Sequence, residues 1–161
     1  MNLIFDGLFM IMLSVIAYKD YREHYIYDKD IQICLVILLM KGIIYSIYID
    51  IIYGLVAGAI LGLLCYWLSN FLIRHESLGM GDVFLLTIVG GYLGNLEIIN
   101  FFMFSNCLSA ILIIPKIINY QKNKHLEIPM APTVFLGLIC YIILDCPNVM
   151  LISEILFKSW L

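Results

Sequence analysis

Two aspartates stand out in a chain that is otherwise largely apolar. Asp82 ends the segment Gly79-Met80-Gly81-Asp82 at the head of an apolar run, and Asp20 ends the first apolar run of the chain. A carboxylate at membrane depth is costly to desolvate, so such residues usually have a function. Two nearby carboxylates suit hydrolysis, because one takes a proton from water while the other, still protonated, polarises a carbonyl group.

The glycines beside Asp82 fit the same chemistry. Because Gly79 and Gly81 lack a Cβ, they permit unusual backbone angles and let an extended substrate approach the main chain. The residues also allow simpler interpretations. Asp82 is equally a candidate helix N-cap that accepts backbone N–H bonds from the next turn, and Asp20 a candidate interfacial charge at a helix end. The other acidic residues near these positions are expected to be solvated, namely Glu23, Asp28, Asp30 and Glu76.

Composition indicates an integral membrane protein. Hydrophobic residues make up 63% of the 161 residues and charged residues only 13%, whereas soluble domains average about 45–50% and 25%. A spanning helix takes about 20 residues, so the chain can cross a bilayer several times but leaves little for a soluble domain. We therefore expect a single membrane-embedded domain over residues 1–161. The net charge of −3 argues against nucleic-acid binding.

Six apolar runs predict an all-α, polytopic protein with about six transmembrane helices. The fourth run is short for a hydrocarbon core of about 30 Å, which places Asp82 at or near membrane depth. A further amphipathic segment is expected to lie on the membrane surface at residues 149–161. The six runs are Leu3–Tyr18, Tyr25–Ile49, Ile51–Ile73, Val83–Leu93, Ile98–Ile118 and Met130–Leu144.

Basic residues predict the orientation, because cytoplasmic loops carry an excess of Lys and Arg. With six spans, both termini lie outside the cell, and Asp20 and Asp82 share the cytoplasmic face. Lys41 is expected in the outer part of the second helix, with its side chain extended to the membrane surface. The basic residues on the cytoplasmic side are Lys19, Arg22, Lys29, Arg74, Lys116, Lys122 and Lys124.

Neither a metal nor an organic cofactor is expected. His24, His75 and His125 are far apart in the sequence and lack the spacing of helical metal ligands. The five cysteines include no C-x-x-C pair and lie mostly in apolar runs, where a cysteine behaves as a small hydrophobic residue.

Three groups of residues occur in the order typical of one family. The first is Asp20 with Arg22 and Ile26, and the second is Gly79-Met80-Gly81-Asp82-Val83 with Gly90-Gly91-Tyr92-Leu93-Gly94. The third is Ile128-Pro129-Met130-Ala131-Pro132. From Ala17 to Gly137 the chain thus resembles the prepilin peptidases, bacterial membrane aspartic proteases with a Gly-x-Gly-Asp motif. The resemblance implies that Asp20 and Asp82 are the catalytic aspartates and that Gly79 and Gly81 are the motif glycines.

The resemblance also implies an activity. It is leader-peptide cleavage of a type IV prepilin or pseudopilin precursor at the cytoplasmic face of a bacterial membrane. Phe84 stands where the family commonly has lysine, and Ile26-Tyr27-Asp28 where it has Ile-Pro-Asn; both departures concern substrate details. Longer members carry an N-terminal domain with paired cysteines linked to methylation, so the expectation here is the short, peptidase-only form.

Two other classes stay open on the residues alone. One is a small transporter or channel component whose intramembrane carboxylates carry protons or cations, and the other is a membrane scaffold of a pilus assembly machine. Transporters tend to contain internal repeats, and the halves of this chain show no convincing self-similarity. The substrate identity and the oligomeric state are not specified by the sequence.

Overall fold

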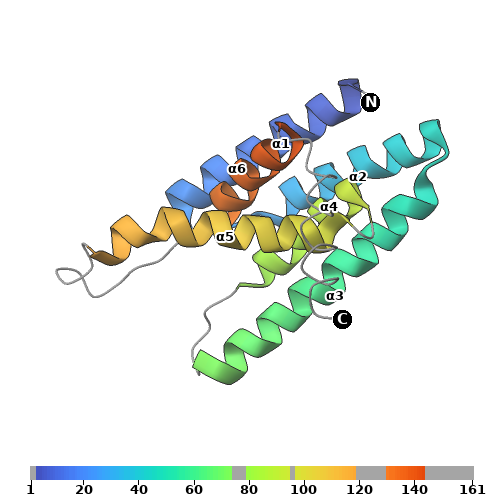
Figure 1. Ribbon diagram of the computed structural model, residues 1–161. Coiled ribbons are helices and arrows are strands. Elements are labelled where there is room, and N and C mark those ends of the chain that lie inside the picture. Colours follow the sequence, from blue (N-terminus) through green and yellow to red (C-terminus); the bar gives the residue numbers. More distant parts are fainter. Residues whose placement is uncertain (1–2, 74–78, 95–96, 119–129, 144–161) are drawn as a thin grey trace, which may run out of the picture.

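The computed structural model describes residues 3–73, 79–94, 97–118 and 130–143. These residues form six helices and no strand, which confirms the all-helical prediction (Figure 1). The helices are α1 (Leu3–Glu23), α2 (Asp28–Tyr45), α3 (Tyr48–Ile73), α4 (Met80–Leu93), α5 (Glu97–Ile118) and α6 (Met130–Ile143). The predicted amphipathic segment 149–161 lies outside the described residues.

The helix ends differ from the apolar runs where a turn is itself apolar. Helix α2 ends at Tyr45, although the apolar run continues to Ile49. Ser46 adopts a left-handed conformation with φ 57°, and its N–H donates to the carbonyl oxygen of Gly42. Such a residue closes a helix. Hydropathy does not detect this turn, because Ile47 and Tyr48 follow Ser46 directly.

One helix of the described residues is long and apolar enough to cross a membrane. It is the Tyr48–Phe71 part of α3, with 24 residues and a mean hydropathy of 2.1. Helices α4 and α6 are apolar but have only 14 residues each. The six predicted spans are therefore present as helices, while their passage through a membrane stays a prediction.

Helices α3 and α4 pack with their backbones in direct contact. A Cβ atom added to Gly54 would lie 2.2 Å from the carbonyl oxygen of Gly90, and one added to Gly58 would lie 2.5 Å from that of Leu86. Small residues allow this approach between apolar helices. Because the obstructing atoms belong to the backbone, α4 is held closely along α3.

Helices α1 and α2 form an antiparallel hairpin with an ion pair toward each end. Lys19 Nζ lies 2.7 Å from Asp30 Oδ2, and Lys41 Nζ lies 2.7 Å from Asp6 Oδ1. Two predictions are wrong here. Asp30 is buried rather than solvated, and Lys41 points to Asp6 rather than to the membrane surface. In each case a residue of opposite charge lies at the same depth on the neighbouring helix.

Helix α6 completes the surroundings of the candidate site. It packs against α1 and α5, and Val134 and Leu138 are fully buried there together with Leu13 of α1. The start of α6 therefore lies beside the last turns of α1, as the orange and blue ribbons of Figure 1 show.

Candidate active site

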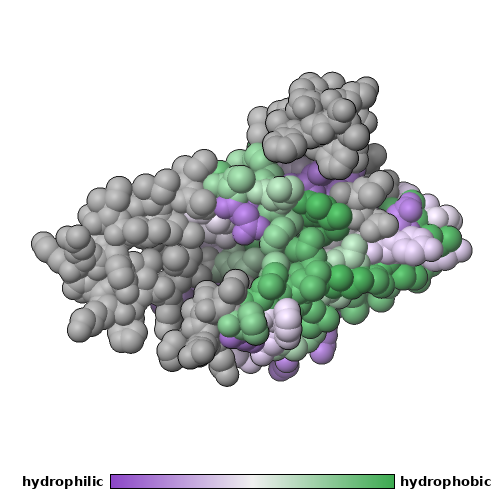
Figure 2. All heavy atoms as spheres, turned by 60° about the horizontal axis from the view of Figure 1, so that its bottom comes forward, coloured by the Kyte–Doolittle hydropathy of each residue, from purple (hydrophilic) through white to green (hydrophobic). Residues whose placement is uncertain are grey.

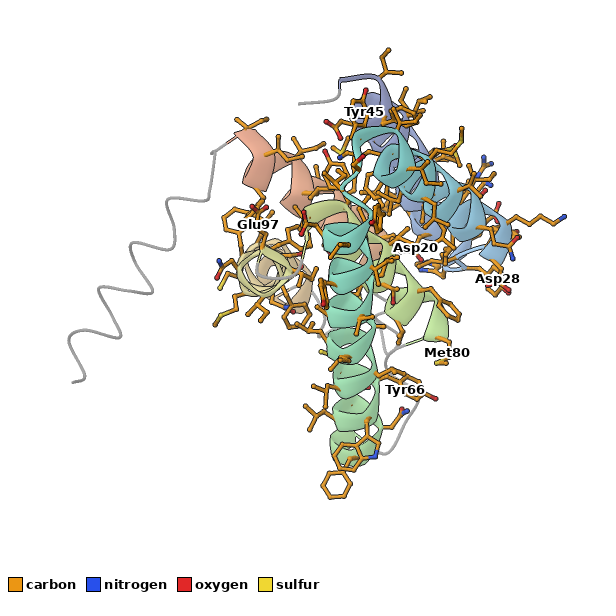
Figure 3. The ribbon with its side chains drawn as sticks, turned by 90° about the vertical axis from the view of Figure 1, so that its right-hand side faces the viewer. Asp20, Asp28, Tyr45, Tyr66, Met80 and Glu97 are labelled. Carbon is orange, nitrogen blue, oxygen red and sulfur yellow. The ribbon has the colours of Figure 1, made fainter. Side chains whose placement is uncertain are left out.

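Asp20 is a buried carboxylate in the last turns of α1. Asp20 is only 5% exposed. Its Oδ2 accepts a hydrogen bond of 2.9 Å from the backbone N–H of Ala131. Ala131 is the second residue of α6, where backbone N–H groups have no partner within the helix. Figure 3 shows Asp20 among the helices, with Asp28 and Met80 at the surface. Asp20 thus lies near a helix end, as the interpretation as an interfacial charge expects, but it is buried and hydrogen-bonded there.

Asp82 lies in the first turn of α4 and is half-buried. Its Oδ2 accepts a hydrogen bond of 3.2 Å from the backbone N–H of Gly79. Gly79, not Asp82, is the N-cap residue. The N-cap interpretation of Asp82 is thus wrong in position, although its carboxylate makes the return bond of a capping box.

The motif glycines have ordinary backbone angles. Gly79 has φ −81° and ψ 156°, and among the described glycines only Gly94 has a positive φ. Gly79 and Gly81 therefore do not use the unusual backbone angles that glycine permits. At Gly81 the requirement comes from packing, because an added Cβ would lie 3.0 Å from Ile26 Cβ. Gly79 is exposed, and the nearest atom to its added Cβ is Asp82 Oδ2, at 3.8 Å.

Ile26 links the surroundings of the two aspartates. It follows Asp20 by six residues, is 8% exposed, and packs against Gly81 directly before Asp82. The segment after α1, the start of α4 and the start of α6 therefore converge at one place. Asp20 and Asp82, predicted to share one face, lie close enough for the charge of Asp20 to act on Asp82.

Both carboxylates hold their protons more strongly than free aspartate does. Asp20 follows the apolar stretch 3–18 of α1, and Asp82 precedes the apolar stretch 83–93 of α4, so neither lies inside one. Burial raises the pKa of Asp20 above 3.8, against the opposing effects of the Ala131 N–H and the positive charge of His24. Burial raises the pKa of Asp82 to about 6; the Gly79 N–H opposes this shift, and the negative charge of Asp20 adds to it. The pair therefore retains one proton more readily than two free aspartates.

One contact of the site is not evident from the sequence. The Ala131 N–H joins Asp20 across 111 positions of the chain. The sequence signal for this contact is the Ile-Pro-x-x-Pro segment, which marks the start of a helix. Pro132 lies in the first turn of α6, and Pro129 lies outside the described residues. Within the described ranges, no three His, Cys, Asp or Glu side chains are grouped to hold a metal ion.

The described residues form an apolar, all-helical fold. Two carboxylates with raised pKa values lie in it, one near the end of α1 and the other near the start of α4. Comparison with known proteins gives the family. Residues 7–114, more than half of the chain, match the Type IV leader peptidase family. The chain belongs to this family of peptidases, as its motifs indicated.

A related protein is the type 4 prepilin-like proteins leader peptide-processing enzyme of Escherichia coli O78:H11 (strain H10407 / ETEC). It is 30% identical over 96 residues, which are 60% of this chain and 34% of the relative. The match thus covers about a third of the relative's length. No solved structure matches the chain.

Proposed function

We propose that the chain is a membrane aspartic endopeptidase that removes the leader peptide from a type IV prepilin or pseudopilin precursor. The observation that carries the proposal is the convergence of Asp20 and Asp82, which lie far apart in sequence, at one site of a leader peptidase family member. A shared proton between two such carboxylates is the basis of carboxylate-dependent peptide hydrolysis.

The surroundings of the two aspartates suggest different roles. Asp20 accepts the Ala131 N–H, which favours its ionised form, so it is suited to take a proton from water. The water oxygen then bonds to the scissile carbonyl carbon. Asp82, whose pKa is about 6, is suited to donate its proton toward the carbonyl oxygen. Collapse of the tetrahedral intermediate breaks the C–N bond and re-forms the C=O bond; the leaving nitrogen takes up the proton held by Asp20, and a hydroxyl proton of the intermediate returns to Asp82.

The outer surfaces of the helices support a polytopic arrangement in lipid. Helix α1 exposes an apolar residue about once per turn along its whole length, and α3 does the same. Figure 2 shows hydrophobic side chains in a broad band over one face. Soluble proteins rarely expose apolar patches of this size. The residues on α1, 36–76% exposed, are Ile4, Leu8, Ile11, Val15, Tyr18 and Tyr21.

The positions of the charges support cleavage at the cytoplasmic border of the membrane. Lys19, Arg22 and Lys29 surround the end of α1 that carries Asp20. Because basic residues favour the cytoplasmic side, this end is proposed to face the cytoplasm, with both termini outside. A pilin-like substrate, anchored by its hydrophobic helix, would present its leader at this face.

The exposed backbone at Gly79 is the proposed contact for an extended substrate. Gly79 is exposed and has space beside its Cα. A peptide that lies along this segment would be next to Asp82, which is in the first turn of the helix that Gly79 caps. Gly81 is less accessible because it packs against Ile26, so its role is to hold α4 against the segment after α1.

Aspartate substitutions test the proposal directly. We expect Asp20→Ala and Asp82→Ala, and the corresponding Asn variants, to be inserted normally but to lower precursor cleavage by about a thousandfold or more. Asp50→Ala is the matched control, because Asp50 is an exposed aspartate in the first turn of α3. Cleavage is measured as the loss of precursor in membranes that hold equal amounts of each variant. Normal processing by either Asp20→Ala or Asp82→Ala would overturn the proposal.

A further inference from the structure

A cluster of charged and aromatic side chains joins three helices at the end of the molecule opposite Asp20 and Asp82. It consists of Asp6 and Phe9 of α1, Lys41 of α2 and Tyr92 of α4, and is called the outer clamp below. Lys41 Nζ lies 2.7 Å from Asp6 Oδ1 and 4.7 Å from the ring centroid of Tyr92. Phe9 stacks on the ring of Tyr92, with ring centroids 4.5 Å apart and planes at 1°.

The outer clamp is too shielded to be an ordinary surface ion pair. The side chains of Lys41 and Asp6 are only 13% and 15% exposed. Removing one partner of such a pair leaves an uncompensated charge in apolar surroundings, which is strongly unfavourable. The ammonium group also gains from the face of the Tyr92 ring, and a desolvated cation–π contact is stronger than an exposed one.

The outer clamp lies several helical turns from the proposed catalytic pair, so a small change at the clamp would move Asp20 relative to Asp82. Asp6 precedes Asp20 on α1 by about 21 Å of helix, and Tyr92 follows Asp82 on α4 by about 15 Å. The clamp therefore ties the helix of Asp20 to the helix of Asp82. Because α4 is held against α3 by backbone contacts, a change at the clamp would tilt α1 rather than α4.

We propose that Lys41 is a positioning residue that sets the approach of Asp20 to Asp82 by holding α1 and α4 together at their far ends. The proposal rests on the proposed function of the two aspartates. Lys41 touches neither aspartate and acts through the orientation of α1. A misplacement of about 1 Å at a reacting centre can lower a rate about a hundredfold, so a clamp at this distance has a measurable effect.

The first test separates positioning from substrate binding. We expect Lys41→Met to lower kcat about ten- to a hundredfold while KM changes less than about threefold, because the substrate contacts stay in place. Lys41→Arg keeps the cation and is expected to recover kcat to within about threefold of the wild type. Lys29→Met is the matched control on the same helix, since Lys29 is exposed, and should leave both constants unchanged. An unchanged kcat in Lys41→Met would overturn the proposal.

The second test does not depend on cleavage. Spin labels are placed at two exposed positions, Tyr21 near the end of α1 and Met80 at the start of α4, in a chain whose five cysteines are replaced by alanine. We expect Lys41→Met to shift or broaden the distance distribution between the labels, and Lys41→Arg to leave it unchanged. A distribution in folded Lys41→Met identical to that of the parent chain would overturn the proposal.

A milder variant covers the case in which Lys41→Met does not fold. Tyr92→Leu removes the aromatic contacts but keeps the Asp6–Lys41 ion pair, and it should shift the label distances in the same direction by less. Unchanged label distances in Tyr92→Leu would then count against the clamp. If the wild-type chain cleaves no precursor, the proposed function fails, while the label distances still decide whether Lys41 orients α1.

Discussion

The helix pair that carries Asp82 and the hairpin that carries Asp20 are held together in different ways. Helices α3 and α4 meet through backbone contacts at Gly54, Gly58 and Gly90, spread over several turns. Helices α1 and α2 are joined by two ion pairs toward their ends. Backbone contact is short-ranged and tolerates no change of spacing, whereas a flexible lysine can follow its partner.

This difference indicates which aspartate is able to move. Asp82 belongs to the closely packed pair, so its position is a fixed reference. Helix α1, which carries Asp20, packs through side chains and not through backbone contact, and polar contacts orient its end, namely the Ala131 N–H and the Lys19–Asp30 ion pair. If substrate binding brings the two carboxylates closer, we expect the end of α1 to supply most of the movement.

The largest effect is expected from filling the α3–α4 contact. Gly54→Ala places a Cβ 2.2 Å from the carbonyl oxygen of Gly90, so the two backbones must separate. We expect a loss of about 3 kcal/mol in the free energy of unfolding and little remaining cleavage. Stability is measured by thermal unfolding in detergent.

Gly7→Ala on the hairpin is the control for this prediction. A Cβ at Gly7 has no neighbouring atom within 4 Å, and alanine favours helix more than glycine does. We expect Gly7→Ala to keep or slightly raise the stability. If Gly54→Ala is tolerated as well as Gly7→Ala, the distinction between the two helix pairs is wrong.

The second prediction concerns the pH dependence of cleavage, which reports the different surroundings of the two aspartates. The proposed mechanism needs one proton on the pair. Burial raises the pKa of Asp82 to about 6, so its proton is present below that pH and is lost above it. We expect kcat/KM of the free enzyme to fall about tenfold per pH unit above this pKa. At low pH both carboxylates are protonated, so kcat/KM falls again. Because burial raises the pKa of Asp20 above the ordinary value of 3.8, this acidic limb of the pH profile lies at higher pH than for a free aspartate.

A substitution beside Asp20 sharpens the pH test. The positive charge of His24 lowers the pKa of Asp20. His24→Gln should therefore move the acidic limb of kcat/KM to higher pH and leave the alkaline limb in place. A profile that is flat from pH 4 to 8 would contradict the shared-proton pair, which titrates as a unit.

The sequence predicted the helices better than the contacts that hold them. Apolar runs identified the six helices of the described residues, since burial and lipid exposure both select apolar residues. The pairings of Asp30 and Lys41 depend on which helices are neighbours and at what depth, and neither is visible in a linear pattern. The glycines show a similar limit, because a Gly-x-Gly segment does not distinguish a need for unusual angles from a need for close packing.

The third prediction tests the ion pair nearest to the site. Lys19→Met leaves Asp30 buried without its partner, since the side chain of Asp30 is only 10% exposed. Lys19 itself is 36% exposed, so we expect a modest loss of about 1–2 kcal/mol in stability. The double variant Lys19→Met/Asp30→Leu should recover part of it, which a double-mutant cycle in thermal unfolding measures. Additive losses in the cycle would show that the ion pair does not hold the hairpin.

The smallest effects are expected where the two regions meet, at the motif glycines. Gly81→Ala presses a Cβ against Ile26, whose side chain must yield by a few tenths of an ångström, so Asp82 and the segment after α1 shift relative to each other. We expect kcat to fall severalfold, with less than about 1 kcal/mol lost in stability, because the methyl group also favours the helix. Gly79→Ala meets no close neighbour and has a permitted φ of −81°, so its effect should appear in KM alone, through the proposed substrate contact. Steady-state kinetics on both variants distinguishes the roles. A kcat loss confined to Gly79→Ala would mean that the glycine nearer to Ile26 does not join the two regions.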